Sequence, residues 1–417
     1  MTRGETSDGA DQFVGGGRAL NHCFAAGRCF AHYRPDFGNE PKFDRFMNEP
    51  GTMNLVSDQL LVRHPSLNAY HPSLICQDDR NWIVVHDLGT SSDALDYRTV
   101  ARRSQDGGAS WDDLGPLLDS SAHPETTHTI RVSRLRDGRL VGFGKLEERS
   151  LHRVYRCNRE TLGQVPMQLF WIESLDDGSS WSSPKIIDPP LEGPTWELCH
   201  HLIELPDGAW GAPVATWRDW EGILPNGHQT GILISRDHGT TWPEFRRTFD
   251  GRKNGRIQWE QSVISLGGDQ LLATAWAFDP NRKETLPSVF TTSSDGGRTF
   301  YEPTETGIFA QTCKVLALGE GRVAAAYRRH DEPGLWMDIA EVGQGSWRKE
   351  HRFPLWLGAK ISNAQGENPA EQLRALSFGY PSMQRLSDHR ILLVFWCEEE
   401  GRTNLRLLTI DVESPGS

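Results

Sequence analysis

The 417-residue sequence lacks the features that would point to a membrane or to nucleic acid. It contains no apolar run of about 18 residues, so we expect no transmembrane helix. Its first residues lack the apolar core of a secretory signal. Its net charge of −12 argues against a nucleic acid or an anionic membrane as a partner. We therefore expect a cytoplasmic protein.

Cysteine is sparse and scattered. The seven cysteines show neither the spacing of a disulfide framework nor that of a metal site, which suits a reducing compartment. Histidines gather at four positions, His71, His128, His200 and His201. Nothing in the sequence brings three ligands together, so we expect no metal ion and no cofactor.

One short turn motif, by contrast, occurs four times. It has the form Ser-x-Asp-x-Gly-x-Ser/Thr-aromatic and covers residues 104–111, 174–181, 235–242 and 293–300. Asp and Ser side chains bond to turn backbone, glycine provides a positive φ, and the aromatic residue can be buried against the next sheet. The motif aspartates are 58 to 70 residues apart, enough for one four-stranded blade each. Such a period indicates an array of sheets.

A second repeat gives the number of blades. Six segments each contain an apolar strand, a tight turn and another apolar strand, at residues 70–85, 128–143, 199–214, 260–275, 312–327 and 380–395. They predict an all-β, six-bladed propeller of four-stranded antiparallel blades over residues 51–417, preceded by an N-terminal arm, residues 1–50. Residues 54–63 read as an extra strand that completes the last blade and closes the ring.

The repeat also identifies the residues that begin the innermost strands and line the axis. In register, these ring positions are His71, Thr129, Cys199, Glu260, Thr312 and Tyr380. Three of them carry side chains capable of chemistry, whereas a ring that only packs the core would favour small apolar residues. A functional site is therefore expected on the axis.

These repeats resemble those of the sialidase (neuraminidase) superfamily, whose six-bladed propellers carry the turn motif as an Asp box. The resemblance covers roughly residues 54–412 and is specific for the fold, not for the reaction. It implies that Tyr380 is a nucleophile and that Glu260 draws its proton. It also implies an Asp that protonates the leaving oxygen or activates water, on the loop after the second strand of blade one. Asp93 is our choice for this residue, and Asp96 is the alternative.

The sequence departs from this family at the three arginines that clamp the substrate carboxylate. His71 stands at the first position, Trp276 at the second and Trp336 at the third, with Arg328 and Arg329 nearby but out of step. We therefore expect a sugar other than ordinary sialic acid. The predicted substrate-binding residues are His71, His128, Glu197, His200, His201, Trp276 and Trp336.

Two of these assignments carry a geometric expectation. The two tryptophans would suit stacking on the apolar face of a less charged sugar, although Trp is also a common filler between blades. Strand alternation implies that His200 and His201 cannot both face one site. The polar insert at residues 357–376 is either a lid or a spectator loop.

Three classes of function stay open at this point. The first is an exo-acting glycoside hydrolase of sialidase-like mechanism, with a variant in which Glu197 and Glu260 form the carboxylate pair found in exo-arabinanases. The second is a polysaccharide lyase that cuts next to a uronate, in which His71 or Tyr380 removes the C5 proton and a cation neutralises the acid. The third is a non-catalytic carbohydrate-binding propeller. In all three the partner is a carbohydrate, and the oligomeric state is open.

Overall fold

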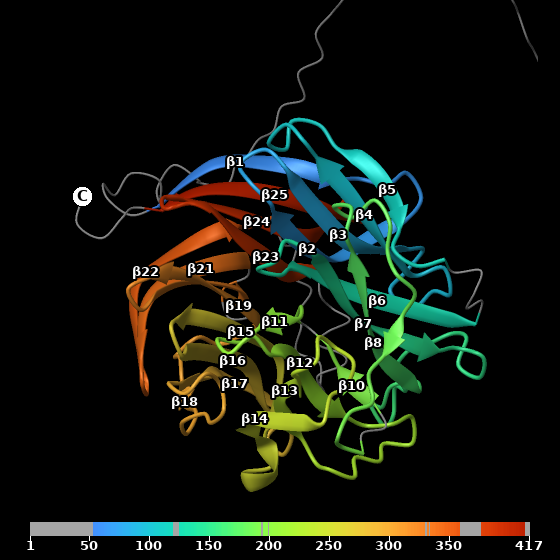
Figure 1. Ribbon diagram of the computed structural model, residues 1–417, viewed down its shortest axis with the longest axis vertical. Helices are drawn as coiled ribbons and strands as arrows, with labels where there is room; N and C mark the ends of the chain where they lie inside the picture. The colour runs from blue at the N-terminus through green and yellow to red at the C-terminus, as the bar shows by residue number, and fades with distance from the viewer. Residues whose placement is uncertain are drawn as a thin grey trace, which may run out of the picture. The chain divides into compact units, whose positions relative to one another are not determined.

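A computed structural model describes residues 53–119, 125–192, 195–198, 200–329, 332, 334–358 and 377–412. These residues form six antiparallel sheets arranged as the blades of a propeller (Figure 1). Apart from strands, the described residues contain one short 3-10 helix, η3 (Gly251–Lys253). No helix in these ranges has the length and apolar character that a membrane crossing requires. The predicted fold class is confirmed, whereas the predicted arm, residues 1–50, lies outside the described residues.

Each blade runs from an innermost strand at the axis to an outer strand. Blade one consists of β2 (Asn68–Cys76), β3 (Trp82–Gly89), β4 (Arg98–Ser104) and β5 (Asp112–Pro116). Blade two consists of β6 (Thr126–Arg134), β7 (Leu140–Glu148), β8 (Met167–Ser174) and β9 (Lys185–Ile186). Blade three consists of the short inner strands β10 (Thr195–Glu197) and β11 (Ile203–Glu204), then β12 (Trp210–Trp217), β13 (Gln229–Ser235) and β14 (Glu244–Asp250).

The second half of the chain repeats this order. Blade four consists of β15 (Ile257–Gly267), β16 (Gln270–Asp279), β17 (Glu284–Ser293) and β18 (Thr304–Glu305). Blade five consists of β19 (Ala310–Gly319), β20 (Arg322–Arg329), β21 (Gly334–Gly343) and β22 (Ser346–Trp356). Blade six consists of β23 (Phe378–Ser387), β24 (Arg390–Glu399), β25 (Arg402–Val412) and β1 (Met53–Val62).

The ring is closed by strands from the two ends of the described chain. β1 pairs antiparallel with β25 and forms the outer strand of blade six, beside it in Figure 1. The Ser57 hydroxyl donates to Thr409 Oγ1 (2.9 Å), and Arg406 pairs with Asp58 (2.7 Å). The predicted closing strand is therefore confirmed. Closure leaves no blade at an open end of the array, where its face would be exposed.

The blades are held together by apolar faces pressed against each other. Every residue of β3 is buried, as is every residue of β12, because both faces of a middle strand contact a neighbouring blade. Phe143 of blade two and Trp210 of blade three belong to one such cluster. This packing fixes the innermost strands relative to the axis.

The four turn motifs lie between the third and fourth strands of blades one to four, as predicted. In the third copy, Ser235 Oγ donates to Asp237 Oδ1 (2.8 Å) and accepts from the Gly239 N–H (2.8 Å). Asp237 also accepts from the backbone N–H and the hydroxyl of Thr241 (2.9 and 2.6 Å). Hydrogen bonds from Thr241 and Ser235 lower the pKa of Asp237 to about 2. The motif is thus a self-contained turn, located away from the axis.

Replacement of the motif serine tests this account of the turn. Ser235→Ala leaves the buried N–H of Gly239 without its acceptor, so we expect the free energy of unfolding to fall by about 1–3 kcal/mol. Denaturant-induced unfolding measures the change. Ser183→Ala, at an exposed position outside the motif, is the control and should change it by less than about 0.5 kcal/mol. Equal effects of the two variants would contradict the assigned role.

Candidate active site at the propeller axis

Four ring positions share an unusual backbone conformation. His71, Glu260, Thr312 and Tyr380 all have φ near +50° (46°, 51°, 51° and 51°). In each case the pairing register with the second strand of the blade shifts at this residue, which marks a β-bulge. Non-glycine residues rarely adopt this conformation, and bulges re-aim side chains next to functional sites. The repeated bulge turns four equivalent side chains toward one place.

These side chains converge on a cavity of about 530 Å³, here called the axial cavity. Each blade contributes to its wall, through His71, Thr129, Glu197, Glu260, Thr312 and Tyr380 in order of blades. Asp93, on the loop between β3 and β4, also lines it. The residues predicted to be catalytic are therefore together in one cavity on the pseudosymmetry axis.

A buried carboxylate lies behind the wall of the axial cavity. Asp87 of β3 is fully buried and accepts hydrogen bonds from Tyr97, Thr99, Thr129 and Arg131 (2.9, 2.7, 2.6 and 3.1 Å). Burial alone would raise the pKa of Asp87, but the Arg131 guanidinium and the hydrogen bonds outweigh it and hold the pKa well below its ordinary value. Asp87 is therefore a fixed negative charge.

Asp87 determines which nitrogen of His71 carries a proton. His71 Nδ1 lies 3.3 Å from Asp87 Oδ2 and 2.9 Å from the Tyr97 hydroxyl, which itself donates to Asp87. Because the carboxylate can only accept, Nδ1 carries the proton and Nε2 has a lone pair. Burial lowers the pKa of His71 below its ordinary value despite the nearby Asp87, so the ring is neutral near pH 7.

The phenol of Tyr380 lies among cationic groups. Arg131 Nε donates to its oxygen (3.1 Å), so Arg131 connects Asp87 to Tyr380. Lys314 Nζ lies 5.0 Å from the centroid of the tyrosine ring, and the His71 ring is edge-on to it at 5.3 Å. A hydrogen-bond donor and nearby positive charge stabilise a phenolate relative to a phenol.

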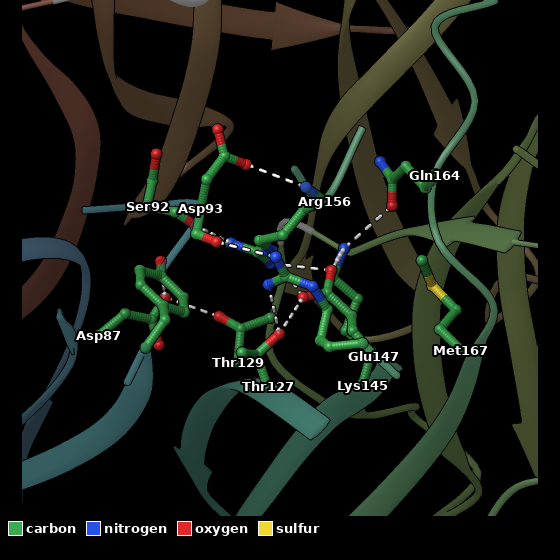
Figure 2. Close-up of polar contacts among 12 residues, drawn as sticks. Asp87, Ser92, Asp93, Thr127, Thr129, Lys145, Glu147, Arg156, Gln164 and Met167 are labelled. Carbon is green, nitrogen blue, oxygen red and sulfur yellow. Dashed lines mark hydrogen bonds and ion pairs between the residues drawn. The ribbon is translucent and has the colours of Figure 1, made fainter. Parts of the chain in front are cut away.

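A second buried ion cluster holds the loop that carries Asp93 (Figure 2). Glu147 is buried and pairs with Lys145 Nζ (3.0 Å) and Arg156 Nε (2.6 Å). The same arginine donates through its backbone N–H to Asp93 Oδ1 (3.1 Å) and through its side chain to the Ser92 carbonyl (3.0 Å). The carboxylate of Asp93 is thereby placed at the cavity wall.

The alternative acid, Asp96, has a different role. It accepts from the backbone N–H and the hydroxyl of Thr90 (3.0 and 2.8 Å) and so stabilises the start of its own loop.

Two glutamates meet on the opposite side of the axial cavity. Glu197 Oε2 accepts from the backbone N–H of Glu260 (3.1 Å), and the Glu260 carboxylate accepts from the Thr312 hydroxyl. Both glutamates line the cavity.

Five of the predicted substrate-binding residues do not line the axial cavity, and three of these five line neither it nor the smaller cavity described below. His128 is buried and accepts from the backbone N–H of Thr99 (3.2 Å). Trp276 is fully buried beside Trp259, and Trp336 is buried in another inter-blade cluster. The two tryptophans fill space between blades, so the predicted stacking on a sugar is wrong for these side chains.

His200 and His201 line a separate, smaller cavity, and both face it. They lie between β10 and β11, outside any strand, so strand alternation does not separate them and the expectation that they face different sites is wrong. The ring residue Cys199 and residues 359–376 of the polar insert lie outside the described residues.

Several residues of the axial cavity were missed by the sequence reasoning. Arg131, Lys145, Arg156 and Glu398 all line it, and so does Arg328, which the repeat places near the third arginine position but out of register. Arg131 lies two residues after the ring position Thr129, and Asp87 is the one carboxylate in the buried strand β3, so both left a signal in the sequence. Arg156 comes from the long loop after β7, for which the repeats give no register.

Comparison with known proteins agrees with this architecture. The family model of the BNR repeat-like domain matches residues 144–393, more than half of the chain. The chain belongs to the BNR repeat-like family. The resemblance of its repeats and fold to the sialidase superfamily is thereby confirmed.

Solved structures similar to this BNR repeat-like protein share its fold at low sequence identity. A Dyadobacter fermentans protein of unknown function has a TM-score of 0.67 and 18% identity, over 88% of this chain and 100% of that one. A Hadza microbial sialidase has a TM-score of 0.58 and 16% identity, over 82% of this chain and 65% of that one. Trypanosoma rangeli sialidase in complex with sialic acid has a TM-score of 0.54 and 15% identity, over 86% of this chain and 59% of that one.

This BNR repeat-like protein thus spans less than two thirds of either of those sialidases. No curated protein matches its sequence. Within the described residues, no group of three or more potential ligands is arranged to hold a metal ion.

The Glu147 cluster leads to a prediction about pH. Burial alone would raise the pKa of Glu147, but Arg156 and Lys145 lower it to about 2. Its stabilising contribution is therefore complete above the unfolded-state pKa of about 4.3 and is lost as the pH falls toward 2. Glu147→Gln leaves two buried cations unpaired and should lower the free energy of unfolding at pH 7 by about 3–5 kcal/mol.

The difference between wild type and Glu147→Gln should shrink as the pH falls from 5 to 3, which denaturant unfolding at each pH measures. Glu160→Gln, at an exposed position, should have nearly the same free energy of unfolding as wild type at both pH 5 and pH 3. If the free energy of unfolding of Glu147→Gln stays below that of wild type by the same amount across this pH range, the assigned ion cluster is contradicted.

Proposed function

We propose that this protein is an exo-acting glycoside hydrolase that cleaves a neutral sugar in the axial cavity by a sialidase-like mechanism. The observation that carries the proposal is the convergence of Tyr380, Glu260 and Asp93 on one cavity. Arg131 and Tyr380 form part of its floor, which suits the end of a glycan better than an internal unit.

In this proposal Tyr380 attacks the anomeric carbon. Its phenol is activated by the hydrogen bond from Arg131 Nε and by the charge of Lys314, with Glu260 taking up the proton. Asp93 protonates the leaving oxygen and then activates water, and its hydrogen bond from the Arg156 backbone holds it at the wall. Arg131 acts as a positioning and electrostatic residue tied to Asp87.

A neutral sugar is favoured by the charges of the cavity. Its lining carries five carboxylates and four side chains of Lys or Arg, so it holds one more negative than positive charge. Two of the cations, Arg131 and Arg156, are paired with the buried carboxylates Asp87 and Glu147. Such a wall gives little attraction to a carboxylate on the substrate, in contrast to a clamp of arginines.

A second candidate mechanism rests on the contact between Glu197 and Glu260. Two glutamates on neighbouring blades, joined through a backbone hydrogen bond, could act as acid and nucleophile of a two-glutamate glycosidase. This mechanism also suits a neutral sugar, but it assigns no chemical role to Tyr380.

The lyase alternative is less favoured by the charges. His71 has the tautomer of a general base, since Nε2 carries the lone pair. A lyase must also neutralise the uronate next to the proton that it removes, and the excess of carboxylates works against this. A hydrolase adds water to the cleaved bond, whereas a lyase gives an unsaturated sugar, so the absorbance of the product decides between them.

Substitution of the three proposed catalytic residues tests the reaction. On a glycoside found by screening neutral exo-substrates, we expect Tyr380→Phe and Asp93→Asn each to lower kcat by about 10²–10⁴-fold, and Glu260→Gln to do so as well. Tyr301→Phe, a half-exposed tyrosine beside an Asp box, is the matched control and should retain full activity.

Unfolding midpoints of all variants should be measured together with the rates, so that loss of fold is not read as loss of chemistry. Full activity of Tyr380→Phe together with an inactive Glu197→Gln would support the two-glutamate mechanism. Full activity of all these variants would contradict both mechanisms.

A further inference from the structure

A second cavity lies on the axis, next to the axial cavity. This inner cavity has a volume of about 140 Å³ and, like the axial cavity, is lined by residues from all six blades. Its wall residues follow those of the axial cavity along the innermost strands, for example Ser73 after His71 and Ser262 after Glu260. Arg131 and Tyr380 line both cavities and therefore lie between them.

The wall of the inner cavity contains donors and no carboxylate. Arg131 and Lys314 contribute two positive charges, and neither Asp nor Glu is among the described residues that line it. His200 and His201 add two imidazole rings, whose centroids are 4.1 Å apart. The composition differs sharply from the axial cavity, where carboxylates are in excess.

Three serine hydroxyls of the inner cavity donate no hydrogen bond to an acceptor among the described residues. Ser262 Oγ accepts from the Val315 N–H (3.4 Å), and Ser382 Oγ accepts from the Leu74 N–H (3.0 Å). Because these bonds use oxygen lone pairs, the O–H protons can point elsewhere. Ser73, although 5% exposed, makes no side-chain hydrogen bond with the described residues. These hydroxyls can therefore donate to an acceptor bound in the cavity.

From this arrangement we infer that the inner cavity binds a small monovalent inorganic anion, such as chloride. An anion would accept from the serine hydroxyls and lie beside the ammonium group of Lys314, while Arg131 keeps its ion pair with Asp87. A water molecule occupies about 30 Å³ of liquid, so 140 Å³ is room for one halide with a few waters. The site is separate from the axial cavity, and its occupancy does not depend on the proposed reaction.

Anion binding has a consequence for stability that can be measured directly. A ligand that binds only the folded protein raises its melting temperature as its concentration exceeds the Kd. We expect Tm to rise with chloride by about 2–4 °C and then to level off, when sodium chloride replaces sodium glutamate at constant ionic strength. Lys314→Met should abolish this rise, and Lys314→Arg, which keeps the charge, should retain it.

Two further variants separate loss of anion binding from general destabilisation of the fold. Ser73→Val removes a hydroxyl that makes no hydrogen bond with the part of the chain that the structure describes, and it should weaken the chloride dependence about tenfold or more. Lys253→Met, at an exposed surface position, is the matched control and should respond to chloride as wild type does.

Crystals of the full chain grown with sodium bromide give the location of the ion. We expect an anomalous bromide peak in the inner cavity of wild type, within hydrogen-bond reach of Lys314 Nζ and the serine hydroxyls, and none there in Lys314→Met. Absence of this peak in wild type would overturn the inference. So would a chloride dependence of Tm that is the same in wild type, Lys314→Met and Ser73→Val.

Discussion

The buried ion pair between Asp87 and Arg131 is the interaction on which the arrangement of the site depends. It joins β3 of blade one to β6 of blade two, and Arg131 Nε reaches Tyr380 on blade six. Taking two charges out of water is costly, and here the cost is offset by further hydrogen bonds from Tyr97 and Thr129 to the carboxylate. Because the same carboxylate faces His71 Nδ1, one buried charge determines the surroundings of both ring side chains.

The repeated β-bulge places side chains of different chemical character at equivalent positions of the ring. A residue with positive φ is strained when it is not glycine, and such strain persists only where surrounding structure enforces it. In this propeller the enforcing structure is the packing between blades together with the closing pair β1 and β25. The ring thus presents His71, Glu260 and Tyr380 to the axial cavity, while residues two to four positions further along the strands form the donor-rich inner cavity.

The sequence was informative where the fold repeats and uninformative where it does not. Counting in register placed Glu260 and Tyr380 at the axis because six blades share one strand pattern. Trp276 and Trp336 were misplaced because the same counting cannot tell a side chain that faces the axis from one that faces the next blade. Arg156 could not have been found, since its loop belongs to no repeat, and pairing of Asp87 with Arg131 is a contact between blades that spacing within one blade does not encode.

In the proposed reaction, Tyr380 forms a covalent bond to a sugar in the axial cavity. The most direct measurement is a peptide map, by mass spectrometry, of enzyme quenched during turnover of a 2-fluoro glycoside, whose intermediate breaks down slowly. We expect one added sugar mass on the peptide that contains Tyr380. The same mass on a peptide that contains Glu197 or Glu260 would contradict it.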